Sequence, residues 1–414
     1  MNAREAEELL LDLELFGMRF GLDRMYKLTT ALGMPQRLFA SVHVVGTNGK
    51  SSTVRMIAAI LERHGLRTGS FTSPHLRSFA ERIEVGETPV GDAEFGAAVG
   101  RAWRAAELVN RTLDEGDEVT QFELLTAAAY HELARRGVEV AVIEAGLGGR
   151  YDATNVIPSK VQVLTGVGLE HTRWLGPTVR DIAEEKLAVV HDQGALVLPA
   201  VLDPDVEEVA ARVAAERHAH VVRAEPEESR WPLRARGAFQ RANFALAEAA
   251  AATFVGRELD PAAVRRAAAE LEVPGRLQVV GERPLTLHDG AHNPNGARAL
   301  ADSLPEVLAG RPLTLVLSVL DDKDAAAILQ ALLPHAARLV VTRCSNPRAL
   351  SPATLESLAS KLAPGVPVET VPAPQAAVAH ARETAGDGAV LATGSIYLIA
   401  DLVRDSAAAR ASTL

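Results

Sequence analysis

The sequence predicts an α/β protein of two domains, the first with a mostly parallel sheet and the second smaller and Rossmann-like. A chain of 414 residues is too long for a single hydrophobic core and suggests two or three domains. Apolar strand-like runs alternate with helical periodicity, which implies parallel strands covered on both faces. The alternation begins near residue 41 and begins again at Leu285. We therefore assign residues 1–280 to the N-terminal domain and residues 281–414 to the C-terminal domain.

The expected strands are apolar and rich in β-branched residues, and helical periodicity separates them. In the first domain, strand-like runs occur at residues 42–45, 138–143, 161–167 and 195–198. Helical patterns occur at residues 122–135 and 179–190. In the second domain, strands are expected at residues 285–288, 313–317, 338–342, 366–371 and 389–391. This order predicts repeated β–α units in both domains.

The composition excludes several classes of protein. Lys and Arg number 43 against 53 Asp and Glu, and the net charge of −10 argues against a nucleic-acid surface. No apolar run approaches the ~20 residues that a membrane span needs, and the N-terminal segment is unlike an export signal. Cys344 is the only cysteine, which fits a reducing compartment. We expect a cytoplasmic monomer that acts on small molecules.

The glycine loop after the first strand is the most informative motif. Residues 46–52 read Gly-Thr-Asn-Gly-Lys-Ser-Ser and lead into a helical pattern. In a strand–loop–helix unit, main-chain N–H groups and the helix N-terminus can hold phosphate. Lys50 offers a charge for the outer phosphates, and the hydroxyl groups can reach a phosphate or its magnesium ion. The motif predicts a P-loop ATPase domain. An ordinary glycine-rich turn is the alternative, and the glycine spacing differs from that of common GTPases.

Polar residues follow several of the expected strands. Glu144 follows the strand at 138–143, which places its carboxylate beside the phosphate loop as a candidate magnesium ligand. We expect His171 to end the next strand in the same way, although a lone histidine can be structural. Asp289 and His292 follow the strand at 285–288 and form a candidate substrate site.

Two further residues are ambiguous on pattern alone. Ser73 precedes a proline, which holds its backbone extended and suits a fixed loop over a site, but many surface turns look alike. Lys186 lies near the end of a helical pattern, where a solvated lysine is the simpler interpretation.

Taken together, these segments resemble the folylpolyglutamate synthases, often bifunctional with dihydrofolate synthase, of the Mur ligase family. The matching segments keep the order of the family and span about residues 15–400: 46–50, 72–76, 81–82, 122–123, 144–155, 171 with 175–176, 185–186, 274–277, 289–294 and 393–397. The resemblance implies an ATP-dependent ligase that adds L-glutamate to a folate, or also to dihydropteroate, through an acyl phosphate. One domain would hold ATP and the acid, and the other would bring the amine.

The resemblance also implies roles for matching positions. The implied nucleotide contacts are Gly46, Thr47, Asn48, Gly49, Lys50, Ser51, Ser52, Asn243, Arg276 and Asp289. Ser73, Glu144 and His171 would bind two Mg²⁺ ions, and Lys186 matches a carbamylated lysine. Arg82 and Asp152 would face the folate, while Asp289, His292 and Ser395 would serve the incoming glutamate. The implied catalytic groups are Lys50, Lys186, Asp289 and His292.

Three positions depart from the family pattern: Ser51 replaces a glycine, Glu170 replaces an aspartate, and Leu187 with Ala188 replaces Ala-Gly. These changes leave the acyl substrate open. The number of glutamates added and any need for a monovalent cation are also open. One alternative is another Mur-family ligase that acts on a cell-wall or coenzyme precursor. The other is a non-catalytic, nucleotide-gated module. Residues 72–82 favour folate, and the cluster at 289–294 disfavours a simple switch.

Overall fold

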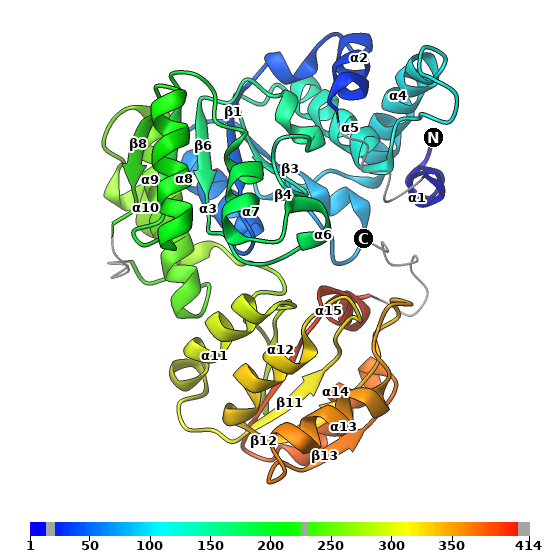
Figure 1. The fold of residues 1–414 in the computed structure, drawn as a ribbon, viewed down its shortest axis with the longest axis vertical. Helices are drawn as coiled ribbons and strands as arrows, with labels where there is room; N and C mark the ends of the chain where they lie inside the picture. Colours follow the sequence, from blue (N-terminus) through cyan, green and yellow to red (C-terminus); the bar gives the residue numbers. More distant parts are fainter. Residues whose placement is uncertain (14–20, 226–230, 405–414) are drawn as a thin grey trace. The chain divides into compact units, whose positions relative to one another are not determined.

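The computed structural model describes residues 1–13, 21–225 and 231–404, which form two compact units (Figure 1). Unit 1 contains Met1–Pro232 and Ala242–Leu271. Unit 2 contains Leu233–Arg241 and the described chain from Glu272 to Arg404. Residue 280, where the sequence placed the domain boundary, lies within strand β9 (Gln278–Glu282) of unit 2.

Unit 1 is built on an eight-stranded sheet with the order β4-β3-β2-β5-β1-β6-β7-β8. The strands are β1 (Ala40–Val45), β2 (Thr68–Phe71), β3 (Ile83–Val85), β4 (Thr88–Pro89), β5 (Val140–Glu144), β6 (Val161–Leu164), β7 (Ala195–Leu198) and β8 (His220–Arg223). All neighbouring strands from β2 to β8 are parallel, and only the β2–β3 and β3–β4 pairs are antiparallel. The mostly parallel sheet predicted from the sequence is confirmed.

The register of the central strands determines where the loops meet. Val44 of β1 is paired with Glu144, the last residue of β5. Because β1 and β5 are parallel neighbours, both end at the same edge of the sheet. The glycine loop that follows β1 therefore begins beside Glu144.

Helices cover both faces of the unit 1 sheet, as its buried apolar strands require. They are α1 (Ala3–Asp12), α2 (Asp23–Ala31), α3 (Lys50–Arg63), α4 (Asp92–Asn110), α5 (Gln121–Arg135), α6 (Thr172–Leu175), α7 (Val179–Leu187), α8 (Pro204–Glu216), α9 (Ala238–Val255) and α10 (Pro261–Glu270). The short 3₁₀ helices of this unit are η1 (Pro35–Arg37), η2 (Phe79–Arg82) and η3 (Ala153–Val156). Helix α9 begins in unit 2 and continues into unit 1.

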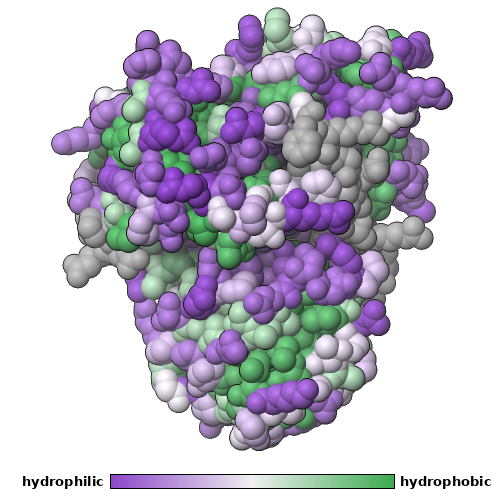
Figure 2. All heavy atoms as spheres, in the orientation of Figure 1, coloured by the Kyte–Doolittle hydropathy of each residue, from purple (hydrophilic) through white to green (hydrophobic). Residues whose placement is uncertain are grey.

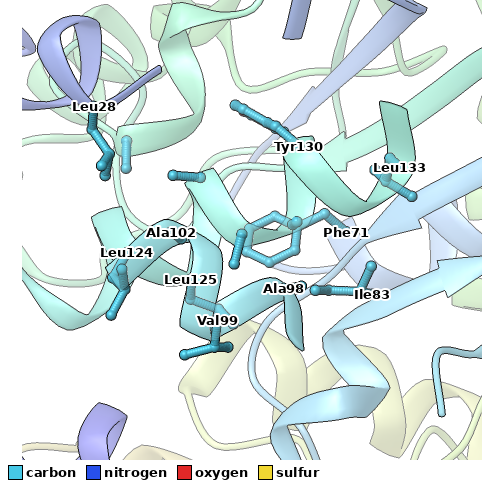
Figure 3. Close-up of a cluster of buried hydrophobic side chains, with 14 of the residues drawn as sticks. Leu28, Phe71, Ile83, Ala98, Val99, Ala102, Leu124, Leu125, Tyr130 and Leu133 are labelled. Carbon is cyan, nitrogen blue, oxygen red and sulfur yellow. The ribbon is translucent and has the colours of Figure 1, made fainter. Parts of the chain in front are cut away.

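The largest apolar cluster of unit 1 lies between the sheet and helices α2, α4 and α5. Figure 3 shows Phe71 of β2 and Ile83 of β3 among side chains of these helices, including Val99, Leu125 and Leu133. Helix α5 starts with a capping box. The Thr120 side chain accepts a hydrogen bond from the Glu123 N–H, and the Glu123 carboxylate accepts one from the Thr120 N–H. This helix was predicted at residues 122–135, within one residue of its observed start.

Unit 2 is a six-stranded sheet with the order β13-β12-β11-β14-β10-β9, in which only β9 is antiparallel to its neighbour. The remaining strands are β10 (Leu285–His288), β11 (Leu313–Leu317), β12 (Ala336–Val341), β13 (Val368–Thr370) and β14 (Ala389–Thr393). Its helices are α11 (Pro294–Leu308), α12 (Ala325–Leu332), η4 (Leu333–His335), α13 (Pro352–Leu362), α14 (Pro374–Thr384) and α15 (Ile396–Val403). The five strands predicted here correspond to β10 through β14.

Hydrophilic side chains predominate on the face of unit 1 that Figure 2 shows, and apolar areas lie between them. Within the described ranges, every helix is too short or too polar to cross a membrane.

Candidate active site

The loop between β1 and α3 requires glycine at two positions. Gly46 and Gly49 have φ angles of 150° and 86°, in the region that residues with a Cβ rarely adopt. A Cβ on Gly46 would lie 1.9 Å from Oγ1 of Thr165, and a Cβ on Gly49 would lie 2.5 Å from Oδ1 of Asn243. The structure thus brings Asn243 of α9 beside the loop. A nucleotide held by the loop would therefore lie near Asn243, for which the resemblance implies a nucleotide contact.

The segment after β6 holds the glycine loop in place. The Thr47 N–H donates to the oxygen of Gly166 at 2.8 Å, and the Gly168 N–H donates to Oγ1 of Thr47 at 3.0 Å. Thr165 Oγ1 donates to the oxygen of Asn48 at 2.6 Å. Among the described residues, no side chain caps the N-terminus of α3, where the first N–H groups have no partner within the helix. These N–H groups are available for an anion.

Groups from three segments meet at the end of β5. Glu144 is buried, and its Oε1 accepts a hydrogen bond of 3.1 Å from the Ser51 hydroxyl. Its Oε2 accepts one of 3.2 Å from the Ser73 N–H. Lys50 lies on the same loop, where its Nζ donates to the oxygen of Thr47 at 3.3 Å. Ser52 is buried in the first turn of α3. The predicted grouping of the loop with Ser73 and Glu144 is therefore present.

The donor set around Glu144 suits magnesium bound together with a nucleotide. Carboxylate and hydroxyl oxygens are hard donors, and Mg²⁺ is usually held by one or two carboxylates with phosphate oxygens and water. In the described part of the chain, no group of three or more His, Cys, Asp or Glu residues forms a metal site by itself. The Glu144 carboxylate, with the Ser51 hydroxyl on one oxygen and the Ser73 main chain on the other, fits a magnesium ion held by one carboxylate, which phosphate oxygens and water would complete.

His171 does not lie where the sequence analysis placed it. Strand β6 ends at Leu164, so the expectation that His171 ends this strand is wrong. His171 is instead the residue before α6, with a φ angle of 52° and a partly exposed side chain. The residues between β6 and His171 form a loop. Thr165, Gly166 and Gly168 of this loop hydrogen-bond to the phosphate loop instead of continuing the strand, so β6 ends before them. Its role as a metal ligand stays a prediction.

Lys186 is buried, contrary to the solvated helix end that the pattern suggested. It lies on α7, and its Nζ donates a hydrogen bond of 2.7 Å to the oxygen of Gly46. Burial, together with the nearby charge of Lys50, lowers the Lys186 pKa from 10.5 to about 7, while Glu170 and Asp152 oppose the shift. An amine with this pKa is neutral in a large fraction of molecules near pH 7.

Asp152 organises the loop that follows Glu144. Its carboxylate accepts from the Leu147 N–H at 2.8 Å, from the Thr154 N–H at 3.0 Å and from the Thr154 hydroxyl. Burial raises its pKa, and these hydrogen bonds act in the opposite direction. The Thr154 hydroxyl in turn lies 2.8 Å from Nε2 of His43. The sequence analysis missed His43 and Thr154, although a histidine inside the apolar run of β1 was a visible signal.

Arg82 is almost completely buried at the end of η2. Its Nε donates to Nδ1 of His75 at 3.1 Å, and its guanidinium carbon lies 5.0 Å from the centre of the Phe79 ring. Arg82 is therefore held by its own segment, and His75 is a third residue that the sequence analysis did not single out.

In unit 2, Asp289 follows β10 and is buried. Its Oδ2 accepts from the Leu277 N–H and its Oδ1 from the Ala291 N–H, each at 2.8 Å. Burial raises the Asp289 pKa, while Arg276 and the two N–H groups act in the opposite direction. The Arg276 guanidinium lies against Gly290, since a Cβ on Gly290 would lie 2.2 Å from Nη1 of Arg276. The charge of Arg276 therefore acts on Asp289, and the roles assigned to both residues stay predictions.

The rest of the predicted cluster lies at the same edge of the unit 2 sheet. His292 is close to Asp289, and its Nδ1 lies 2.9 Å from the oxygen of Gly290. Ser395 follows the parallel neighbour β14 and accepts from the Tyr397 N–H at 3.2 Å as the N-cap of α15. Because β10 and β14 are paired in register, the residues that follow them meet at one edge.

Comparisons with known proteins identify similarity over nearly the whole chain. The profile described as "Mur ligase middle domain" matches residues 44–251, and "Mur ligase, glutamate ligase domain" matches residues 275–396. The chain is 37% identical over 370 residues to the dihydrofolate synthase/folylpolyglutamate synthase of Mycobacterium tuberculosis, covering 80% of this chain and 75% of the relative. It is 32% identical over 420 residues to the Bacillus subtilis enzyme of the same name, covering 94% and 95%.

Solved structures of folylpolyglutamate synthases are also similar to this chain over nearly its whole length. The Mycobacterium tuberculosis folylpolyglutamate synthase complexed with ADP superimposes with a TM-score of 0.90 at 33% identity, covering 97% of this chain and 98% of that one. The structure described as E. coli FolC in complex with DHPP and ADP has a TM-score of 0.85 at 26% identity, covering 97% and 96%. The resemblance and the architecture expected from the sequence are both confirmed.

Proposed function

This chain belongs to the folylpolyglutamate synthase/dihydrofolate synthase group of the Mur ligase family and is an ATP-dependent ligase, and we propose that it joins L-glutamate to a reduced folate, to dihydropteroate, or to both. The observation that carries the proposal is the meeting of the phosphate loop, Ser51 and Ser73 at Glu144. The comparisons support this function, and not the cell-wall ligase or the nucleotide-gated module that the sequence left open.

The chemistry explains why ATP is needed. A carboxylate resists attack by an amine because its charge repels the nucleophile and oxide is a poor leaving group. A carboxylate oxygen of the folate first attacks the γ-phosphorus, ADP leaves, and an acyl phosphate results. The glutamate amine then attacks the acyl carbon, loses a proton and expels phosphate, which forms the amide. Lys50 and the free N–H groups of α3 stabilise charge on the transferred phosphoryl group.

We assign Ser73 and Glu144 to one magnesium ion, and Glu144 with His171 to a second. When bound, magnesium neutralises charge on the phosphates. Ser51 and the Ser73 N–H orient the Glu144 carboxylate through its two oxygens. The assignment predicts that Mn²⁺ bound with ADP broadens NMR signals of side chains near Glu144, and that Glu144→Gln weakens this effect.

We also assign a carbamate to Lys186. The neutral amine that burial favours is the form that adds CO₂, with loss of a proton from nitrogen. The carbamate nitrogen keeps one N–H, which can still donate to the Gly46 oxygen. Protein supplied with ¹³C-bicarbonate should show a carbamate signal that Lys186→Met lacks. Absence of this signal from active wild-type protein would reject the assignment.

In unit 2, Asp289, Arg276, His292 and Ser395 are proposed to serve the glutamate and the nucleotide. Asp289 is fixed as an acceptor by two main-chain N–H groups, and His292 lies beside it. Either group can accept the proton of the attacking amine. Arg82 and Asp152 of unit 1 are proposed to shape the folate site.

The decisive experiment supplies purified protein with ATP, Mg²⁺ and L-glutamate, and offers dihydropteroate and a reduced folate in parallel. The product masses show which acid is extended and by how many glutamates. Binding of ATP without glutamate-dependent phosphate release from either acid would contradict the proposed function. Parallel assays in K⁺ and Na⁺ test a monovalent cation, and sedimentation tests the expected monomer. We expect the enzyme to work in the cytoplasm.

A further inference from the structure

A chain of hydrogen bonds runs beneath the loop that follows Glu144. His43 lies within β1, and its side chain is completely buried. Its Nε2 lies 2.8 Å from Oγ1 of Thr154 in η3, and this hydroxyl donates to Oδ1 of Asp152. The chain thus links the strand that leads into the phosphate loop with the carboxylate assigned to the folate site.

The direction of this chain follows from the number of protons in it. The Asp152 carboxylate accepts at both oxygens, from the hydroxyl and N–H of Thr154 at Oδ1 and from the Leu147 N–H at Oδ2. A threonine hydroxyl has one proton, and here that proton points to Asp152. The Thr154 oxygen can therefore only accept from His43. It follows that His43 carries its proton on Nε2.

The surroundings of His43 keep the ring in this neutral form. Burial, with a smaller contribution from His191, lowers the His43 pKa from 6.5 to about 3, so the ring has one donor and one acceptor at pH 7. The acceptor is Nδ1, which has no hydrogen-bond partner in the described part of the chain. An unpaired buried nitrogen destabilises the protein, and an apolar residue in β1 would avoid this loss. The bond that His43 does form, to Thr154, is therefore the one to explain.

The chain ends on a loop whose shape depends on Asp152. Asp152 is the N-cap of η3, and its hydrogen bond from the Leu147 N–H closes the turn of residues 147–152. Tyr130 of α5 donates to the main-chain oxygen of Thr154 at 3.0 Å, while His43 acts on the hydroxyl of the same residue. Hydrogen bonds that point in one direction strengthen one another in a buried environment. The His43 N–H therefore stabilises the orientation of the Asp152 carboxylate and of the turn that it closes.

We propose that His43 is a positioning residue for the acid substrate: by donating to Thr154 it directs the hydroxyl proton to Asp152 and holds residues 145–152 in the shape that receives the folate or dihydropteroate. His43 is buried beneath this loop and acts through Thr154. This role rests on the proposed function, in which Asp152 shapes the folate site. Loss of the His43 donor then weakens binding of the acid and leaves the ATP site intact.

The test measures the KM for the acid, the KM for ATP and kcat of the full-length protein, with whichever acid the wild type extends. His43→Leu should raise the KM for the acid about tenfold, because it removes one buried hydrogen bond, and should change the KM for ATP and kcat by less than about twofold. His43→Gln places an amide N–H near the position of Nε2 and should recover most of the affinity. His43→Asn is equally polar but places its amide near Nδ1, so it should behave like His43→Leu.

Two further changes separate positioning from general damage to β1. Ser41→Ala removes a buried hydroxyl from the same face of β1, one with no partner in the described part of the chain, and should leave all three constants near those of the wild type. Thr154→Val keeps the shape of the side chain but removes the hydroxyl, and should raise the KM for the acid. Because His43 acts through Thr154, adding His43→Leu to Thr154→Val should raise this KM no further.

NMR of ¹⁵N-histidine-labelled protein tests the position of the proton separately. A neutral ring protonated at Nε2 should persist at pH 5, and its signal should disappear in His43→Gln. Four results would overturn the proposal: a His43 ring protonated at Nδ1, equal rises in the KM for the acid and for ATP, additive effects of His43→Leu and Thr154→Val, or equal losses in His43→Gln and His43→Asn. These results leave the proposed function standing, whereas a wild type that extends neither acid would reject that function and this role with it.

Discussion

The side-chain amine of Lys186 donates a 2.7 Å hydrogen bond to the main-chain oxygen of Gly46. This contact joins α7 to the first residue of the phosphate loop, although the two residues are 140 positions apart. A buried lysine is therefore part of the loop's support, and its protonation state matters for stability.

The first prediction concerns the pH dependence of stability. Because the folded-state pKa of Lys186 is lowered from 10.5 to about 7, the unfolded chain binds more protons between these values. The wild type should then gain stability relative to Lys186→Met as the pH rises from 7 to 10.5, by up to about 5 kcal/mol. Urea unfolding in CO₂-free buffer measures this change. A stability difference that is constant over this range would contradict the lowered pKa.

The second prediction concerns Glu144. Glu144→Gln keeps the shape of the side chain but removes the charge, so kcat/KM for ATP should fall at least about a hundredfold. Glu184 is half-buried and forms an ion pair with Arg212, and Glu184→Gln is the matched control with little expected effect. Near-normal ligation by folded Glu144→Gln protein would remove Glu144 from the metal site.

The third prediction concerns Ser51, which stands where the family pattern has a glycine. Ser51→Ala removes the hydroxyl that donates to Glu144 and retains a good helix former. The Mg²⁺ concentration for half-maximal rate should rise by about tenfold or more, since a hydrogen bond to a charged group contributes about 1.5–3 kcal/mol. Ser51→Thr keeps the hydroxyl and should behave like the wild type. If the alanine variant has an unchanged Mg²⁺ dependence, Ser51 does not orient the carboxylate.

The fourth prediction concerns Asp289. An asparagine can accept only one of the two main-chain N–H bonds, so Asp289→Asn should destabilise unit 2 by about 1–3 kcal/mol. The KM for glutamate should rise more than the KM for ATP. Asp302→Asn, an exposed change on α11, is the control. Equal increases in both KM values would indicate a general structural defect instead.

The sequence predicted the strands with apolar runs well, because burial on both faces leaves a continuous apolar signal. Residues 195–198 and 285–288 match β7 and β10. Strand β2 (Thr68–Phe71) escaped prediction because its threonine, glycine and serine give no apolar run. Strand β9 carries a glycine and lies at the edge of its sheet, where one-sided burial weakens the pattern.

Local sequence patterns could not predict contacts between segments that lie far apart in the chain. Ser51 and Glu144 are 93 residues apart, and periodicity cannot show that a hydroxyl meets a carboxylate. The burial of Lys186 was missed for the same reason, since the residues that cover it come from another part of the chain. The resemblance to a family indicated a role for Lys186 that the helical pattern did not.

The bonds from Thr165, Gly166 and Gly168 to the phosphate loop span 117 to 121 residues. A nascent chain that has emerged from the ribosome only as far as α5 already contains every residue of the loop but none of these supporting residues. Nucleotide binding should therefore not stabilise the nascent chain at this stage. Its stabilising effect on folding should begin only after β6 has been translated and added to the sheet.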